Sequence, residues 1–407
     1  MDPITHGITG ALLGKSYFFE KHGRTAAFAV FLGSVFPDVD VILDTFSHDP
    51  LATIRFHRGF THSLIGLPVF SAALALLTIM LLRRRVRGEP NFAILFWCYA
   101  VGIGSHILLD TMTSYGTRIW NPISSHRYTL DWLFIVDFLL TACVLTPQVL
   151  AWVHSASLRH FPRSAAIRAL AMWLIFSAAT IGVWELAQKL EDGFSWLAAA
   201  ILIVVFGLLF FAPLWRNTDS GISRARWCRA GLYVTAAYIL TCATAHHAAV
   251  ERVRGFADAK GLTAISEAAI PLPPSLLYWD GMIRTQEGVY HSRFSLADAQ
   301  PAAFTYLADS SPSPVLTHAL ALPEVQTYLW FARFPVLRTR VENGVEVAEF
   351  IDVRFAMRHD RSVPPFTFRV LMNAQGKLLE DDWVVGATHL HLRRDIKGYT
   401  PPLDEMR

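Results

Sequence analysis

The chain has 407 residues, of which 53% are hydrophobic and only 17% are charged, and its formal net charge is +3 at pH 7. This composition is more apolar than that of ordinary soluble domains and indicates a membrane protein. The positive charge is too small and too scattered for a nucleic-acid surface, so we expect no nucleic-acid partner. The cysteines Cys98, Cys143, Cys228 and Cys242 lie in apolar stretches, which favours buried thiols over disulfides or a zinc cluster.

Two short apolar stretches, residues 4–19 and 25–36, open the chain. We expect them to form half-helices, the arms of a tilted hairpin or short spans. Six longer stretches follow, each with roughly the ~20 residues that a bilayer crossing needs. They are residues 64–82, 92–109, 133–153, 167–187, 196–215 and 229–247. The N-terminus lacks a basic segment before its apolar residues, so no cleavable signal peptide is expected.

Arginines in the connecting loops predict the orientation of these helices. Basic clusters follow the first, third and fifth long stretches, at residues 83–87, 159–168 and 216–229. The positive-inside rule assigns these three loops to the cytoplasm. If the two short stretches form a hairpin, its tip at Lys21 and Arg24 is also cytoplasmic. The external, periplasmic face is then predicted to carry His6, the segments Pro37–Asp40 and His57–Ser63, the end of the stretch 92–109 and the loop 110–132.

The character of the sequence changes after residue 247. Residues 248–270 are predicted to form a helical linker that ends at Pro271. β-branched and aromatic residues then alternate with polar ones in stretches 276–294, 325–341, 345–357 and 365–373. Turn signals separate these stretches at Glu287-Gly288, Glu342-Asn343-Gly344 and Asn373-Ala374-Gln375-Gly376, which predicts antiparallel hairpins.

The predicted fold is therefore an α-helical polytopic membrane domain followed by a β-rich extramembrane domain. Residues 1–140 would form a membrane-embedded helical domain that carries the site described next. Residues 141–247 would add further transmembrane helices, and residues 271–407 would form the β-rich soluble domain. The β-rich domain is expected on the periplasmic side of the membrane if the last predicted span, residues 229–247, ends on that side.

Residue types that bind divalent metals are concentrated in the first third of the chain. They are His6, Asp38, Asp40, His57, His62, His106 and Asp110. Imidazole and carboxylate are the ligands that zinc and similar ions prefer, and ionisable groups near a bilayer are retained mainly where they pair, bind ions or react. Each group also has a purely structural reading, as a hydrogen-bonded pair, an acidic loop or a helix cap.

The spacing of these residues favours ligation. His106 and Asp110 are four residues apart, which places them on one face of a helix. Asp38 and Asp40 follow Pro37, which should end the preceding helix, and two carboxylates at this spacing can chelate one cation or bridge two.

The segment His57-Arg58-Gly59-Phe60-Thr61-His62-Ser63 lies at the mouth of a predicted span. Gly59 would permit a tight turn, and Thr61 or Ser63 would cap the following helix. A helix N-terminus beside an arginine is a natural phosphate site, so Arg58 is a candidate for substrate binding and catalysis.

The loop from residue 111 to residue 137 contributes outer candidates. Asp131 and Asp137 flank the start of the third long stretch, where a carboxylate needs a partner or an ion, so both are candidates for supporting the ligands. Arg118 and Arg127 are candidates for holding a substrate.

Five motifs together resemble the YdjM/DUF457 family of inner-membrane proteins, over residues 1–140. The motifs are DPITHGITGALLG, FPDVD, HRGFTHS, HILLD and TSYGTR. The resemblance implies a bacterial inner-membrane protein and a metal-dependent hydrolase; the family is also described as LexA-binding.

A more distant likeness is to zinc-dependent phospholipase C and P1-type nucleases. Their ligands also run His, Asp, His and then His-x-x-x-Asp, an order reproduced here up to His106 and Asp110. A second His-x-x-x-Glu/Asp motif is missing, so the likeness implies one or two ions rather than three.

The predicted function is a membrane-bound hydrolase of a phosphoester, such as a phospholipid or another lipid-linked phosphate. Its cofactor would be a divalent metal, Zn²⁺ or alternatively Mn²⁺, with Asp38, Asp40 and Arg58 at the reacting centre. The bilayer and an amphiphilic substrate are the expected partners. Two alternatives remain: a non-catalytic membrane regulator or scaffold, which would hold no stoichiometric metal, and a metal transporter, which should carry ligands through the middle of several spans. An intramembrane protease is disfavoured because the chain has no His-Glu-x-x-His motif.

Overall fold

The computed structural model divides the chain into two compact units. The helical unit comprises Met1–Val39, Arg58–Thr244 and Pro271–Tyr278, and the sheet unit comprises Asp40–His57, Ala245–Ile270 and the chain from Trp279 onwards. The structure describes residues 1–45, 49, 51–82, 91–154, 162–189, 195–215, 223–342, 345–356, 364, 366–372, 378–385 and 388–392. Most of the three predicted cytoplasmic loops, at residues 83–90, 155–161 and 216–222, therefore lie outside the described residues.

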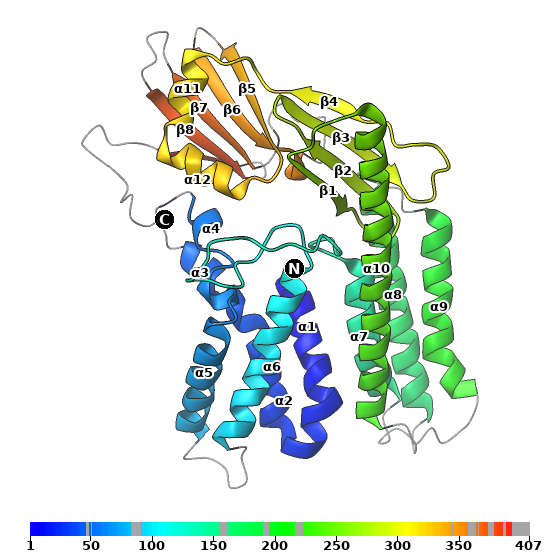
Figure 1. Ribbon diagram of the computed structural model, residues 1–407. Helices are drawn as coiled ribbons and strands as arrows, with labels where there is room; N and C mark the ends of the chain where they lie inside the picture. Colours follow the sequence, from blue (N-terminus) through cyan, green and yellow to red (C-terminus); the bar gives the residue numbers. More distant parts are fainter. Residues whose placement is uncertain are drawn as a thin grey trace. The chain divides into compact units, whose positions relative to one another are not determined.

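The helical unit begins with a helical hairpin. Helix α1 (Pro3–Leu13) continues through a π-helical turn (Gly14–Phe18) into α2 (Phe19–Val35), where Gly23 takes a left-handed φ of 79° and the chain reverses. Gly7 of α1 faces Phe31 and Val35 of α2, whereas Gly14 of the π-helical turn faces Ala27, so the two arms are antiparallel. Figure 1 shows the two arms side by side.

Further helices complete this unit. Helix α5 (Gly66–Leu82) and α6 (Phe92–Thr111) pack beside the hairpin, and α6 also packs against α2. Helix α7 (Phe138–Val153), α8 (Pro162–Lys189) and α9 (Trp196–Trp215) follow, and α10 (Arg224–Lys260) enters the sheet unit beyond Thr244. The four cysteines are free, as predicted.

Among the described residues, three helical stretches are long and apolar enough to cross a membrane. They are Pro3–Ile42, which includes the hairpin, Phe92–Thr111 and Ser164–Glu185; the bent pair Ala52–His62 and Gly66–Leu82 makes a fourth if it counts as one span. The prediction of six long spans is therefore wrong. Residues 133–137 are not helical, so α7 has only 16 residues. The predicted stretch 229–247 belongs to a 37-residue helix that also carries charged residues.

Helices α2 and α6 approach closely because glycines meet at their contact. A Cβ atom on Gly102 would lie 2.4 Å from the Val30 carbonyl oxygen, and one on Gly33 would lie 2.8 Å from the Tyr99 carbonyl oxygen. Small residues that let backbones approach are typical of packed membrane helices. This contact also brings the Ser34 carbonyl of α2 to the side chain of His106 on α6.

Substituting Gly102 by Ala should push α2 and α6 apart. We expect the free energy of unfolding to fall by about 1–3 kcal/mol, the usual cost of overpacking. Gly104→Ala is the matched control on the same helix, because its Cβ would meet only Leu67 Cδ1 at 3.5 Å. That change should be neutral or stabilise by up to ~1 kcal/mol, through helix propensity. Unfolding in detergent followed by circular dichroism compares the two; equal stability would contradict the close helix contact.

The sheet unit confirms the predicted β-rich C-terminal part. One sheet has the order β1 (Ser266–Pro271), β2 (Tyr278–Arg284), β3 (Gly288–Ser295) and β4 (Thr305–Ala308), as Figure 1 shows. The second has the order β5 (Pro335–Glu342), β6 (Val345–Asp352), β7 (Thr367–Met372), β8 (Leu378–Val385) and β9 (Thr388–Leu392). Its neighbouring strands are antiparallel, and Glu342 pairs with Val345 at the turn predicted there. The predicted turn at residues 373–376 lies outside the described residues.

Two local predictions for this unit are wrong. Residues 325–331 belong to helix α12 (Pro323–Phe331), which follows the short helix α11 (Pro314–Leu320), rather than to a strand. Pro323 starts α12, and Val325, Tyr328 and Phe331 are buried at helical spacing. The stretch 248–270 is not only a helical linker, because α10 ends at Lys260 and strand β1 begins at Ser266.

Candidate metal centre

Four of the predicted ligands meet in the helical unit. Asp38, His62, His106 and Asp110 each place one ligand atom so that all four atoms lie within 4.8 Å of one another. The side chains of His62, His106 and Asp110 are at most 1% exposed, whereas that of Asp38 is 14% exposed. The group is thus almost closed, with one edge reached by solvent at Asp38.

Short helical turns position the two ligands that lie outside α6. Pro37 opens a 3-10 turn (Phe36–Asp38) directly after α2, as the sequence predicts, and Asp38 is its last residue. His62 ends a second such turn (Phe60–His62), and the Ser63 hydroxyl accepts a bond from the Gly66 amide at the start of α5. The left-handed residue in this segment is Arg58, with φ of 57°, and Gly59 follows it with φ of −92° and ψ of −126°.

Hydrogen bonds fix the direction of both imidazoles. His106 Nδ1 lies 2.8 Å from the Ser34 carbonyl oxygen, which can only accept, so this nitrogen carries the proton. His62 Nδ1 lies 2.9 Å from the Thr61 hydroxyl. The two Nε2 atoms then face each other at 3.0 Å. Holding the outer nitrogen in this way is how proteins orient metal-binding histidines.

The inner atoms of the group are all acceptors when each neutral imidazole carries its proton on Nδ1, as His106 does and as His62 does when the Thr61 hydroxyl accepts from it. Asp110 Oδ2 lies 3.3 Å from His62 Nε2 and 3.5 Å from His106 Nε2, and Asp38 Oδ1 lies 3.7 and 3.5 Å from the same nitrogens. Four buried lone pairs at these distances repel one another unless a proton or a cation lies between them. Two imidazoles and two carboxylates are a donor set that fits a divalent metal. The group can therefore hold a metal ion.

Asp110 is held from several sides. Its Oδ1 lies 3.1 Å from His6 Nε2 and contacts the α-amino group of Met1, and its Oδ2 lies 2.9 Å from Arg58 Nε. The His6 ring also stacks on the His106 ring, with centroids 3.6 Å apart. Burial lowers the pKa of the Met1 amine to about 6, and the positive charge of Arg58 acts in the same direction. His6 thus contacts both ligands of α6, Asp110 through its Nε2 and His106 through its ring. Its own role as a metal ligand stays a prediction.

Arg58 is locked in place behind the group. It is 2% exposed, and its Nη1 donates to the Asp110 carbonyl at 3.2 Å and to the Thr113 hydroxyl at 2.8 Å. Its guanidinium lies 4.9 Å from the centre of the Tyr115 ring. One arginine charge therefore opposes the two carboxylates, which leaves a net negative charge suited to a cation.

The remaining candidates lie outside the group of four. In the sheet unit, His57 Nδ1 and Asp40 Oδ1 form a pair at 3.0 Å, and their role as ligands stays a prediction. In the helical unit, the Arg118 amide donates to the Arg58 carbonyl at 3.1 Å, and Arg127 donates to the Gly116 carbonyl at 3.2 Å. Both arginines thus belong to the same loop structure as Arg58, and substrate binding by either stays a prediction.

The two outer aspartates are both buried. Asp131 has a left-handed φ of 54° in the loop before α7. Asp137 caps α7 through the Leu140 amide and accepts bonds from Tyr238 at 2.7 Å and Ser275 at 2.5 Å. Burial raises the pKa of Asp137, although these hydrogen bonds act against the shift. Asp137 therefore ties α7 to α10 and to the segment 271–278.

Sequence reasoning missed three partners of the centre. They are the Ser34 carbonyl, Thr113 and the stacking of His6 on His106. Each partner depends on how helices pack, so no residue pattern along the chain could have identified it.

The fold and the site define a helical membrane protein with a buried His/Asp group that can hold a metal ion. Residues 1–190 match the family model described as YdjM inner membrane protein. This match confirms the resemblance drawn from the five motifs and extends it beyond residue 140. No curated protein and no solved structure matches the chain.

Proposed function

We propose that the protein is a membrane-bound, metal-dependent hydrolase of a phosphoester. The observation that carries this proposal is the convergence of Asp38 Oδ1, His62 Nε2, His106 Nε2 and Asp110 Oδ2 beside a buried arginine. Zn²⁺ suits this set best, because it accepts mixed imidazole and carboxylate ligands at low coordination number. The family match supports an inner-membrane location, and the proposal places the protein there as a multi-pass protein with its site on the periplasmic side.

The chemistry requires an ion with room for a water molecule. A divalent ion held by Asp38, His62, His106 and Asp110 would lower the pKa of a bound water towards ~7 and polarise the scissile group. Asp38 is the ligand nearest to solvent, so its carboxylate is the group best placed to accept a proton from that water. His6 contacts Oδ1 of the Asp110 carboxylate and Arg58 contacts Oδ2, so the two side chains hold this carboxylate in one orientation. Arg118 and Arg127 are proposed to hold the phosphate.

The test uses the full chain purified in detergent, stripped with a chelator and reloaded with Zn²⁺ or Mn²⁺. We expect about one or two ions per chain and hydrolysis of bis(p-nitrophenyl) phosphate that falls at least ~100-fold on stripping, the scale of metal and electrostatic contributions. An Asp38→Asn variant should bind the metal more weakly and lose most of the activity. Stoichiometric metal without hydrolysis of any phosphoester would contradict the enzymatic proposal, and absence of metal would favour a regulatory protein.

A further inference from the structure

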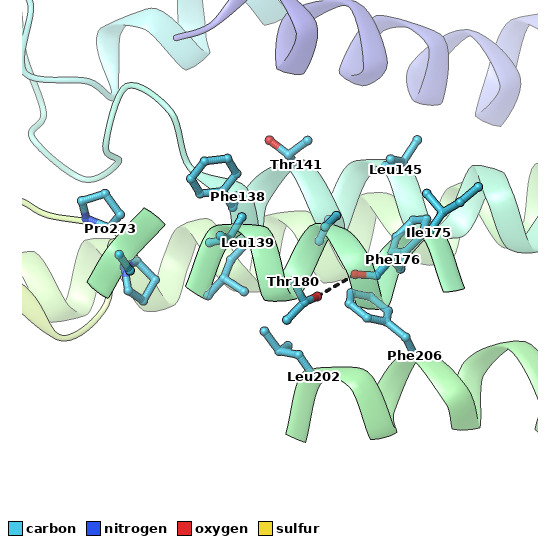
Figure 2. A pocket seen from close by; sticks show the side chains of 15 residues that line it. Phe138, Leu139, Thr141, Leu145, Ile175, Phe176, Thr180, Leu202, Phe206 and Pro273 are labelled. Carbon is cyan, nitrogen blue, oxygen red and sulfur yellow. Dashed lines mark hydrogen bonds between the residues drawn. The ribbon is translucent and has the colours of Figure 1, made fainter. Parts of the chain in front are cut away.

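A largely apolar pocket opens within the helical unit. Its volume is about 260 Å³, and it is lined by α7, α8, α9 and the segment 271–278. Figure 2 shows Phe138 and Leu139 of α7, Phe176 of α8 and Phe206 of α9 around it, with Pro273 at one end. Helix α8 carries one of the candidate membrane spans, so a bilayer would surround this pocket.

The wall of the pocket offers nothing to a polar ligand. Only two of its lining residues, Thr141 and Thr180, have polar side chains. Thr141 donates to the Asp137 carbonyl at 2.9 Å, and Thr180 donates to the Phe176 carbonyl at 2.8 Å, the bond drawn in Figure 2. Both hydroxyl protons are therefore used within the helices, and the pocket suits a hydrocarbon.

The pocket is elongated along the helices. On α8 its lining runs from Ile175 to Ala187, a distance of about 18 Å at 1.5 Å per residue. Phe138, Ala187 and Pro273 line the end of the pocket nearest the start of α7, and Leu145 and Ile175 line the opposite end. An occupant that follows the wall would be extended rather than compact.

The pocket is connected to the metal centre through helix α1. The Thr141 hydroxyl, which lines the pocket, lies 2.8 Å from the Thr5 hydroxyl of α1. The next residue, His6, contacts Asp110 of the centre. The end of the pocket near the start of α7 is closed by the segment 271–278, which Ser275 anchors to Asp137. Thr5 and His6 of α1 thus link the wall of the pocket to the candidate site.

We propose that this pocket holds an alkyl chain of the amphiphilic phosphoester that the metal centre hydrolyses. This inference rests on the proposed function and names the substrate class as one with a long hydrocarbon chain. The size agrees: an apolar cavity of ~150 Å³ takes benzene, so a pocket of this volume takes roughly ten carbon atoms of a chain. Alkyl chains are also the apolar ligand that a bilayer supplies.

The first test maps binding without relying on hydrolysis. The full chain is reconstituted in vesicles that contain phosphatidylethanolamine with a diazirine near the end of one acyl chain, then irradiated and digested. We expect the adducts to concentrate on residues 138–145, 175–187 and 202–206. Ala179→Phe should reduce them about tenfold, because the phenyl ring displaces several methylene groups of the chain. Ala178→Phe is the matched control, since Ala178 is exposed like Ala179 but does not line the pocket.

The second test separates the pocket from the chemistry. Ala179→Phe should lower kcat/KM about tenfold for a long-chain phosphoester and leave bis(p-nitrophenyl) phosphate hydrolysis unchanged. Adducts spread evenly over the exposed helix faces, equal labelling of the two variants, or cross-links to a second copy of the chain would overturn the proposal. So would an equal loss of both activities. If the wild type hydrolyses neither substrate, the proposed function fails, and the labelling arm still decides whether the pocket binds a chain.

Discussion

Replacing His106 with Ala should abolish stoichiometric metal binding. His106 is one of two imidazoles in the group of four, and its loss also removes the stacking partner of His6 and the hydrogen bond to Ser34. We expect the affinity for the metal, measured by equilibrium dialysis, to fall at least ~100-fold. That is the upper end of the range for removing a residue that only supports a ligand. Elemental analysis of the purified protein by mass spectrometry measures the bound metal.

The control for this variant is His126→Ala. His126 is exposed in the loop before α7, and its ring contacts Tyr128 rather than the centre. That variant should keep the metal content of the wild type. Combining Asp110→Ala with His106→Ala should leave no measurable binding, and a double variant that retains the wild-type metal content would refute the proposed ligand set.

Removing the charge of Arg58 should give the largest loss of stability. Arg58→Met leaves Asp110 buried with its main positive partner gone, and breaking a buried ion pair from one side costs about 3–5 kcal/mol. A bound divalent ion would compensate part of this loss, so the effect should be larger in chelator than in excess Zn²⁺. Thermal unfolding in detergent, with and without metal, measures both values.

An exposed ion pair provides the matched control. Arg254 lies on α10 with half of its side chain exposed and pairs with Glu251 and Glu267. Arg254→Met should change the stability far less than Arg58→Met, because water and salt screen a surface ion pair. Adding Asp110→Asn to Arg58→Met should recover part of the lost stability, because the unpaired charge is then gone. Similar stability of the Arg58→Met and Arg254→Met proteins would show that Arg58 does not neutralise the centre.

The sequence predicts the class of the protein and the centre better than the spans. His106 and Asp110 are found together because helical spacing alone places them on one face. Placing Asp38 and His62 beside this pair required the assumption that all external loops converge. In the structure, packing of α2 and α5 against α6 brings both side chains to His106 and Asp110. Asp40 and His57 form a pair with each other at 3.0 Å, which the residue types could not reveal because both sets carry the same chemistry, and their role as ligands stays a prediction.

The number of long membrane spans was overestimated for a physical reason. Apolar composition marks residues 133–153 as one stretch, but Asp137 caps a helix there and binds Tyr238 and Ser275, so the helix starts late. Ser275 is far along the chain, and its partner could not be read from the sequence. In the sheet unit, burial of Val325, Tyr328 and Phe331 against neighbouring elements selected a helix over the strand that their residue types favour.

X-ray absorption at the metal edge of the zinc-loaded full chain tests the central claim most directly. The geometry predicts nitrogen and oxygen ligands at ~2.0–2.2 Å, with the outer scattering of two imidazoles and no sulfur. In the His106→Ala protein, imidazole scattering should be reduced or the ion lost. A spectrum of the wild type with sulfur ligands at ~2.3 Å, or with no imidazole, would contradict a centre built from Asp38, His62, His106 and Asp110.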